Sequence, residues 1–183
     1  GLAVIATLKS RGRGPEIASD FSPARRAVAE KLGADIIVDP AQISPHSHWS
    51  AAGVATTTAE RMLQSLSGKT GKRAVIFECV GVPGVLQGII EAAPGGAQII
   101  VAGVCMDTDR FEPFLCINKQ LDFRFVLGYS PEEFAATLHN IAHGHIDVLP
   151  AVTSEVGLAG VAAAFKALAD PEAQCKIVVR PGA

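Results

Sequence analysis

The sequence predicts an α/β protein in which helices cover both faces of a parallel sheet. Two observations carry this prediction. Short segments with nearly continuous apolar runs alternate along the chain with helical segments, and glycines close several of the apolar runs. Continuous apolar runs are typical of strands that are buried on both faces, as in a parallel sheet between two layers of helices.

The first elements follow this alternation. Residues 2–11 are largely apolar and predict a helix that ends before Gly12. Residues 16–21 predict a strand that closes on an acid. Ser22 and Pro23 then supply an N-cap and a proline at the first helical position.

The next stretch contains the one irregular segment. The helix that follows Pro23 covers residues 24–32, and residues 35–38 form a short apolar strand. Residues 41–58 are rich in Ser, Thr, His, Ala and Gly without a clear period, so they predict a long loop. A helix resumes over residues 59–66.

The second half returns to the alternation. Residues 73–80 and 97–104 predict strands on either side of a helix over 85–93. A further apolar strand is expected over 121–127. A Ser-Pro-Glu-Glu start signature then predicts a helix to about residue 143. The tail departs from the pattern, with a loop, a helix near 158–169 and a last strand over 176–180.

Composition excludes several classes of protein. The chain has 183 residues, of which 49% are hydrophobic, so it can bury a core and is not disordered. Sixteen Lys and Arg against eighteen Asp and Glu leave no basic excess for nucleic acid. No run approaches the roughly 18 apolar residues of a membrane span. The four cysteines form no CxxC pair, which favours buried thiols in a reducing cytoplasm.

Several blocks, in this order and at these intervals, resemble the cofactor-binding domain of the zinc-containing medium-chain alcohol dehydrogenases and reductases. The blocks are GLAVI at 1–5, Asp20 nineteen positions after Gly1, AEKLGAD at 29–35, FECVG at 77–81, GGAQIIVAG at 95–103 and KIVV at 176–179. The resemblance covers nearly the whole chain.

The resemblance implies a Rossmann-type doubly wound parallel sheet that lacks its first strand. That strand and the first two glycines of the family's GxGxxG turn would precede Gly1, so we expect the chain to be a piece of a longer protein. Residues 1–146 would be the dinucleotide-binding domain. Residues 147–183 would be a segment that returns to a catalytic domain outside this chain.

Four candidate residues would hold the adenosine and pyrophosphate end of a dinucleotide. Gly1 and Leu2 open the first helix, where free N–H groups and the helix dipole favour a pyrophosphate. Asp20 ends the second strand of the family pattern, where a carboxylate can accept both ribose hydroxyls; its other interpretation is a turn residue before Ser22. Arg25 matches a basic position that helps to hold the adenosine, or it is a solvated helix charge.

A second group lies at strand ends, where open α/β sheets bind ligands. By resemblance this group faces the nicotinamide end of the cofactor, although apolar strand ends and a glycine turn would explain it equally. Its members are Val80, Gly81, Ala102, Gly103, Val104, Leu127 and Gly128. Lys176 resembles a position that reaches a cofactor phosphate, or it is an exposed edge-strand lysine.

The resemblance implies an NAD-dependent dehydrogenase that acts on a small alcohol or carbonyl substrate and assembles as a homo-oligomer. Zinc would belong to the parent enzyme, and no catalytic or metal-binding residue is expected in this chain, which alone would be inactive. His46 and His48, like the histidines of 139–145, lack a complete ligand pattern and are interpreted as surface residues. Two alternatives stay open: a zinc-free quinone or enoyl reductase of the same superfamily, and a non-catalytic nucleotide-sensing module.

Overall fold

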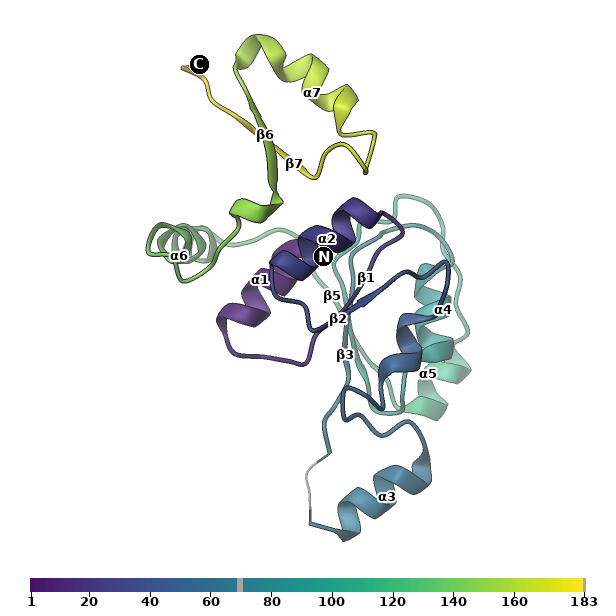
Figure 1. Cartoon of the computed structure of the whole chain (residues 1–183). Coiled ribbons are helices and arrows are strands. Elements are labelled where there is room, and N and C mark those ends of the chain that lie inside the picture. Colours follow the sequence, from purple (N-terminus) through teal and green to yellow (C-terminus); the bar gives the residue numbers. More distant parts are fainter. Residues whose placement is uncertain (69–70, 183) are drawn as a thin grey trace. The chain divides into compact units, whose positions relative to one another are not determined.

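The computed structural model describes residues 1–68 and 71–182 (Figure 1). Within them the chain divides into two compact units, each described separately below. The first unit contains Gly1 and residues 46–129. The second contains residues 2–45 and the chain from Ser130 onward.

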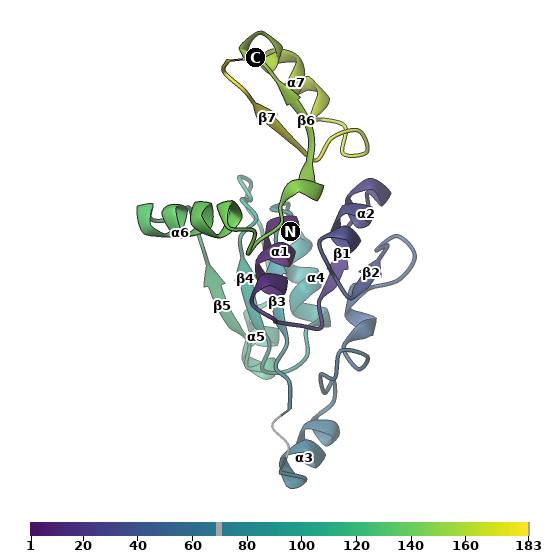
Figure 2. The same ribbon diagram turned by 60° about the vertical axis from the view of Figure 1, so that its left-hand side comes forward.

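The first unit is built on a three-stranded parallel sheet. Its strands are β3 (Val75–Glu78), β4 (Gln98–Val101) and β5 (Asp122–Phe125), in the order β3-β4-β5. Figure 2 shows the three strands side by side. The register aligns their last residues, Glu78 with Val101 and Val101 with Phe125, so the chain leaves all three strands at the same edge.

Two helices of this unit make its core against the sheet. Helix α4 (Val85–Ala92) buries Leu86, Ile89 and Ile90 against Ile99 of β4. Helix α5 (Pro113–Lys119) adds Leu115 and Cys116 to the edge of this cluster. Figure 1 shows α4 and α5 together on one side of β3 and β5. The apolar runs that predicted these strands are therefore explained by burial under α4 and α5.

The same unit carries most of the segment that was expected to be a loop, residues 46–58 of 41–58. Residues 45–48 form a short 3₁₀ helix, η1 (Pro45–His48), which begins one residue before the unit. Helix α3 (Thr58–Leu66) follows and begins with a capping box. The hydroxyl of Thr57 accepts from the backbone N–H of Glu60, and the carboxylate of Glu60 accepts from the backbone N–H of Thr57. The residues between η1 and α3 form no strand or α-helix, as predicted.

The second unit contains two pairs of parallel strands. Strand β1 (Ile17–Ser19) pairs with β2 (Ile36–Val38), and β6 (Val152–Val156) pairs with β7 (Lys176–Val179) with an irregularity in register between Val152 and Ser154. The helices of this unit are α1 (Leu2–Ser10), α2 (Pro23–Lys31), α6 (Pro131–Ala142) and α7 (Val161–Ala167). Two short 3₁₀ turns, η2 (Leu149–Ala151) and η3 (Leu158–Gly160), precede β6 and α7.

Most predicted elements are confirmed, with ends that shift by one to three residues. Two elements were missed. Helix α5 has seven residues and begins at Pro113, so it is too short for an apolar period to show. Strand β6, with the sequence VTSEV, becomes a strand by pairing with β7 more than twenty residues later.

Every strand pair in the described residues is parallel, as the sequence predicted. The division of the chain at residues 146 and 147 stays a prediction. In the described part of the chain, no helix combines the length and apolar character that crossing a bilayer requires.

Candidate cofactor-binding site

The strand ends of the first unit bring seven of the predicted site residues to one edge. Because β3, β4 and β5 are parallel and in register, the segments that follow them leave the sheet together. The N–H groups of Ala102 and Gly103 both donate to the carbonyl of Glu78, each at 2.9 Å. The residues gathered here are Val80, Gly81, Ala102, Gly103, Val104, Leu127 and Gly128.

This edge presents apolar side chains to its surroundings. Val80 is 65% exposed, Val104 64% and Leu127 91%. Large apolar side chains exposed beside one another at a sheet edge are typical of a ligand-binding or contact surface. The edge therefore offers an apolar wall formed by the ends of three strands.

Two glycines fit against each other at this wall. Gly81 has a φ of +71°, and a Cβ built on it would lie 2.6 Å from the backbone nitrogen of Val104. A Cβ on Gly103 would overlap the backbone nitrogen of Gly81 and lie 2.6 Å from Oε2 of Glu78. The backbones that follow β3 and β4 thus approach each other more closely than any side chain allows.

Glu78 is a residue of this edge that the sequence analysis did not single out. It is 5% exposed, and its Oε1 accepts hydrogen bonds from the N–H groups of Val80 at 2.6 Å and Gly81 at 2.8 Å. The signal was present as the single acid within the apolar run VIFE. A buried carboxylate needs partners, so such an acid indicates a specific set of donors nearby.

In the second unit, Asp20 follows β1 and takes part in the turn to α2. Its Oδ1 accepts from the N–H of Ser22 at 2.9 Å, and the structure gives its Oδ2 no partner among the described residues. The hydroxyl of Ser22 in turn accepts from the N–H of Arg25. Asp20 therefore takes part in the turn through one oxygen, and its ribose-binding role stays a prediction.

The neighbouring arginines have different roles. Arg26 donates from Nη1 to the carbonyls of Asp20 and Phe21, both at 2.8 Å, and its Nη2 lies 3.1 Å from a carboxylate oxygen of Asp39. Arg25 is half-buried, and its side chain makes no such contact in the described residues. Arg26 thus holds the turn, while the guanidinium of Arg25 is not committed to it.

The remaining predicted residues are placed as follows. Gly1 is exposed and precedes α1, of which Leu2 is the first residue. Lys176 is the exposed first residue of β7, and its carbonyl accepts a hydrogen bond from the hydroxyl of Thr153. Leu2, Asp20, Arg25 and Lys176 all belong to the second unit, and Gly1 is grouped with the first.

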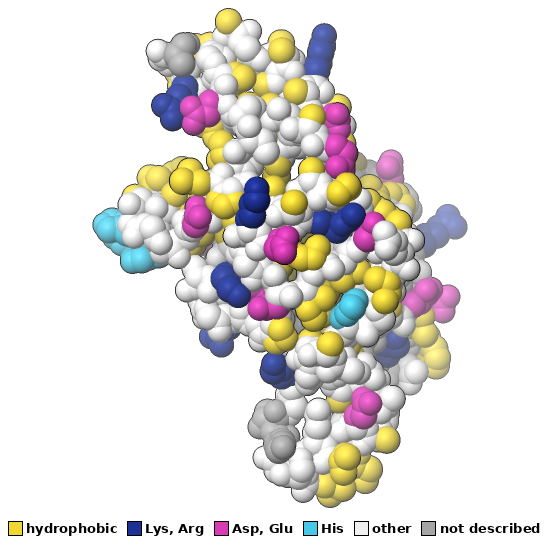
Figure 3. Space-filling view, viewed as in Figure 1, with side chains coloured by type: hydrophobic (Ala, Val, Ile, Leu, Met, Phe, Trp, Pro, Cys, Tyr) yellow, Lys and Arg dark blue, Asp and Glu magenta, His cyan; other side chains and the backbone are white. Residues whose placement is uncertain are grey.

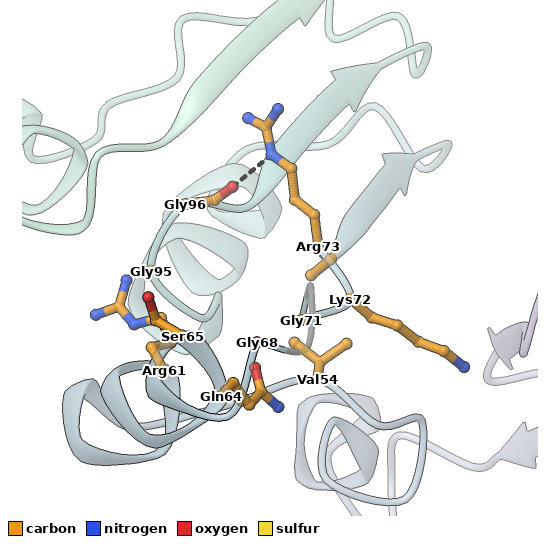
Figure 4. Close-up of a pocket in the computed structure, with 12 residues that line it drawn as sticks. Val54, Arg61, Gln64, Ser65, Gly68, Gly71, Lys72, Arg73, Gly95 and Gly96 are labelled. Atoms are coloured by element: carbon orange, nitrogen blue, oxygen red, sulfur yellow. Dashed lines mark hydrogen bonds between the residues drawn. The ribbon is translucent and has the colours of Figure 1, made fainter.

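One hollow of the first unit lies at the opposite end of β3. It has a volume of about 540 Å³ and is lined by residues of α3, by the segment before β3 and by the Gly95-Gly96 turn. Figure 4 shows that its cationic side chains diverge: Lys72 and Arg61 extend in opposite directions. Arg73 is committed to the carbonyl of Gly96 at 2.6 Å and to Asp122. These charges do not converge on a ligand.

The histidines form no metal centre as they lie. The rings of His139 and His143 are tilted by 33° with their centroids 4.0 Å apart, and the ring centroid of His145 lies 6.0 Å from that of His143. Figure 3 shows the exposed group over α6. His46 packs against Trp49, and burial, followed by the charge of Lys119, lowers its pKa. Within the described ranges, no three or more His, Cys, Asp or Glu side chains are grouped to hold a metal ion.

Comparison with known proteins identifies the family. A sequence model described as "Zinc-binding dehydrogenase" matches residues 1–143, more than three quarters of the chain. The chain belongs to the zinc-binding dehydrogenase family. The resemblance that the sequence blocks suggested is thereby confirmed.

The relatives of this zinc-binding dehydrogenase chain are oxidoreductases. It is 30% identical over 182 residues to the (R,R)-butanediol dehydrogenase of Bacillus subtilis, an alignment that covers 99% of the chain and 48% of that protein. It is 22% identical to the L-idonate 5-dehydrogenase (NAD(P)(+)) of Escherichia coli, over 97% of the chain and 46% of the relative. The chain therefore spans about half the length of the curated relatives it matches.

Solved structures of such dehydrogenases share the fold. The crystal structure of the 2R,3R-butanediol dehydrogenase from Bacillus subtilis has a TM-score of 0.71 at 27% identity, over 98% of this chain and 47% of that one. The crystal structure of L-idonate 5-dehydrogenase from Escherichia coli has a TM-score of 0.78 at 20% identity, and the match covers 98% of this chain and 46% of that one. The predicted Rossmann-type α/β class is confirmed.

Proposed function

We propose that this chain binds NAD as the cofactor-binding part of a zinc-type medium-chain alcohol dehydrogenase. The whole enzyme would transfer a hydride between an alcohol carbon and the nicotinamide ring. The observation that supports this most is the joint edge of β3, β4 and β5, where Gly81 and Gly103 clear the backbone of side chains. An open parallel sheet binds its ligand at the carboxyl ends of its strands.

The proposed contacts divide between the two ends of the cofactor. The apolar edge would pack against the nicotinamide end through Val80, Gly81, Ala102, Gly103, Val104, Leu127 and Gly128. The free Oδ2 of Asp20 would accept from the adenosine ribose, and the uncommitted guanidinium of Arg25 would lie near the adenosine. Gly1 and Leu2 would present the helix N-terminus to the pyrophosphate, and Lys176 would contribute a positive charge.

The chemistry of the whole enzyme is proposed from the family. Zinc, when bound in the parent, would act as a Lewis acid on the substrate oxygen. This chain would supply binding and orientation of the cofactor. An alcohol or its carbonyl product is the proposed substrate class, since relatives are named for (R,R)-butanediol, L-idonate and sorbitol.

Two other functions are candidates: a zinc-free quinone or enoyl reductase of the same superfamily, and a non-catalytic nucleotide sensor. Alcohol oxidation by the whole protein, lost on chelation and restored by zinc, would favour the first proposal. Activity that survives complete removal of zinc would favour the reductase. Cofactor binding by the whole protein without turnover of alcohols, quinones or enoyl compounds would favour the sensor.

A change at Asp20 tests the cofactor assignment. We expect the chain to prefer NAD over NADP, because a carboxylate at the ribose repels a 2′-phosphate. Unit charges about 4 Å apart repel by roughly 4 kcal/mol at an effective dielectric near 20, and salt reduces this. Calorimetric titration with both cofactors should show a preference of at least about tenfold, and Asp20→Ser should remove most of it.

The control for this titration is Asp39→Asn, which removes a carboxylate that pairs with Arg26 in the same unit. It should leave the preference between the two cofactors unchanged. Equal affinity of the wild-type chain for NAD and NADP would show that Asp20 is a turn residue only. Binding of neither cofactor would refute the proposed function for this chain.

We also infer a homo-oligomer in a reducing cytoplasm. Strand β5 pairs on one side with β4 and has no strand partner on its other side among the described residues. Apolar side chains lie exposed along this strand and on α5, with Phe125 66%, Phe114 71% and Ile117 74% exposed. A second copy would cover this surface, and the four free thiols agree with a reducing compartment.

A further inference from the structure

Glu78 places a negative charge directly beneath the apolar edge. It is the last residue of β3, and its carboxylate is packed against the backbone at Gly103, where a Cβ would lie 2.6 Å from Oε2 and 2.8 Å from Oε1. The N–H groups of Val80 and Gly81 both donate to Oε1. The structure gives Oε2 no hydrogen-bond donor within the residues it describes.

The charge of this carboxylate is not balanced locally. Among the described residues, the ion pairs involve Asp35, Asp39, Asp122 and Glu155, and none reaches Glu78. Two backbone dipoles stabilise the carboxylate but carry no net charge. At 5% exposure the carboxylate is also poorly screened by water, so its field extends into the adjoining edge.

We propose that Glu78 selects the redox state of the bound cofactor, favouring the oxidised over the reduced form. This inference rests on the proposed function, which seats the nicotinamide end against Gly81 and Gly103. The oxidised nicotinamide ring carries a positive charge and the reduced ring is neutral, so a fixed negative charge beside the ring stabilises only the oxidised form. Glutamine is a neutral amide of the same shape as glutamate, and at position 78 its side-chain oxygen would accept the same two hydrogen bonds without the charge.

A purely structural role would leave a different signature. If Glu78 only holds the turn after β3, its loss weakens binding of both redox forms by the same factor. If its charge acts on the ring, the ratio of the two dissociation constants changes. Unit charges about 10 Å apart at an effective dielectric near 20 interact by roughly 1.7 kcal/mol, which corresponds to about a 15-fold effect on affinity. Full screening by about 0.1 M salt would reduce this effect to about threefold.

The experiment measures dissociation constants of NAD⁺ and NADH for the full 183-residue chain and its Glu78→Gln variant, by calorimetry at fixed salt. Glu78→Gln should weaken binding of NAD⁺ relative to NADH by about threefold to 15-fold. Glu91→Gln is the matched control, because it removes an exposed carboxylate on α4 of the same unit. It should leave the ratio unchanged. Glu78→Met is a second neutral variant, and circular dichroism checks that each variant is folded.

The outcomes separate this inference from the proposed function. Suppose that the wild-type chain binds both forms, and that Glu78→Gln and Glu78→Met change the ratio of the two dissociation constants by less than twofold. This result overturns the role of Glu78 and leaves the cofactor assignment standing. If Glu91→Gln changes the ratio of the two dissociation constants as much as Glu78→Gln does, the role of Glu78 is also overturned. A wild-type chain that binds neither form refutes the proposed function and this inference with it.

Discussion

The contact between Gly103 and the turn after β3 predicts a large cost for a single methyl group. In Gly103→Ala the new Cβ would meet the backbone nitrogen of Gly81 and both carboxylate oxygens of Glu78, all closer than van der Waals contact allows. These atoms belong to backbone or to a side chain held by two hydrogen bonds, so they cannot move aside cheaply. Overpacking of this kind costs about 1–3 kcal/mol.

The same substitution at Gly88, Gly88→Ala, should stabilise the fold instead of destabilising it. Gly88 lies inside α4 and is exposed, and a Cβ built on it meets nothing within 4 Å. Alanine in a helix interior is more stable than glycine by about 0.5–1 kcal/mol. The two variants therefore differ by about 1.5–4 kcal/mol, although each adds one methyl group.

Urea and thermal unfolding, followed by circular dichroism, measure this difference. The unfolding midpoint should fall for Gly103→Ala and rise for Gly88→Ala, by roughly 2–4 °C for each kcal/mol. The dependence on urea concentration should be the same in all three proteins. If Gly103→Ala is as stable as the wild type, the strand ends do not interlock as described, and the argument for a cleared backbone fails.

Two further predictions concern pH and assembly. Burial, followed by the charge of Asp35, raises the pKa of Glu16, whose carboxylate oxygens have no hydrogen-bond partner among the described residues. Because the pKa of Glu16 is higher in the folded than in the unfolded chain, the free energy of unfolding falls as pH rises from about 4.5 through the raised value. Glu16→Gln should remove that fall when the free energy of unfolding is measured from pH 4 to 7. An unchanged pH profile would contradict this. Light scattering should show that the wild-type chain is an oligomer and that Phe125→Lys dissociates it. Leu66→Lys, at an exposed apolar site on α3, should leave the oligomer intact. A wild-type monomer at high concentration would refute the proposed interface.

The sequence predicted the strands of the first unit because their signal is local. VIFE and QIIV are apolar runs next to glycine turns, and burial under α4 makes each run a strand. Helix α5 and strand β6 carry no comparable signal. The first is too short to show a period, and the second depends on β7 for its partner.

The candidate site was predictable in position but not in detail. The rule that ligands bind at strand ends located Gly81 and Gly103, yet it could not show that the two glycines exclude each other's side chains. Likewise, spacing could place a basic residue after Asp20, but only the phase of α2 shows that Arg26, rather than Arg25, holds the turn. Both details depend on the three-dimensional arrangement of the backbone, which the order of residues alone does not give.

The close approach of Gly81 and Gly103 has a consequence for protein engineering. The segments 78–81 and 102–104 fit only as a pair, because a side chain at either glycine would occupy the backbone space of the other segment. If only one of these segments were replaced by the corresponding loop of a relative, its side chains would clash with the backbone of the other segment. Redesign of cofactor use in this scaffold should exchange both segments together, as a single unit of substitution.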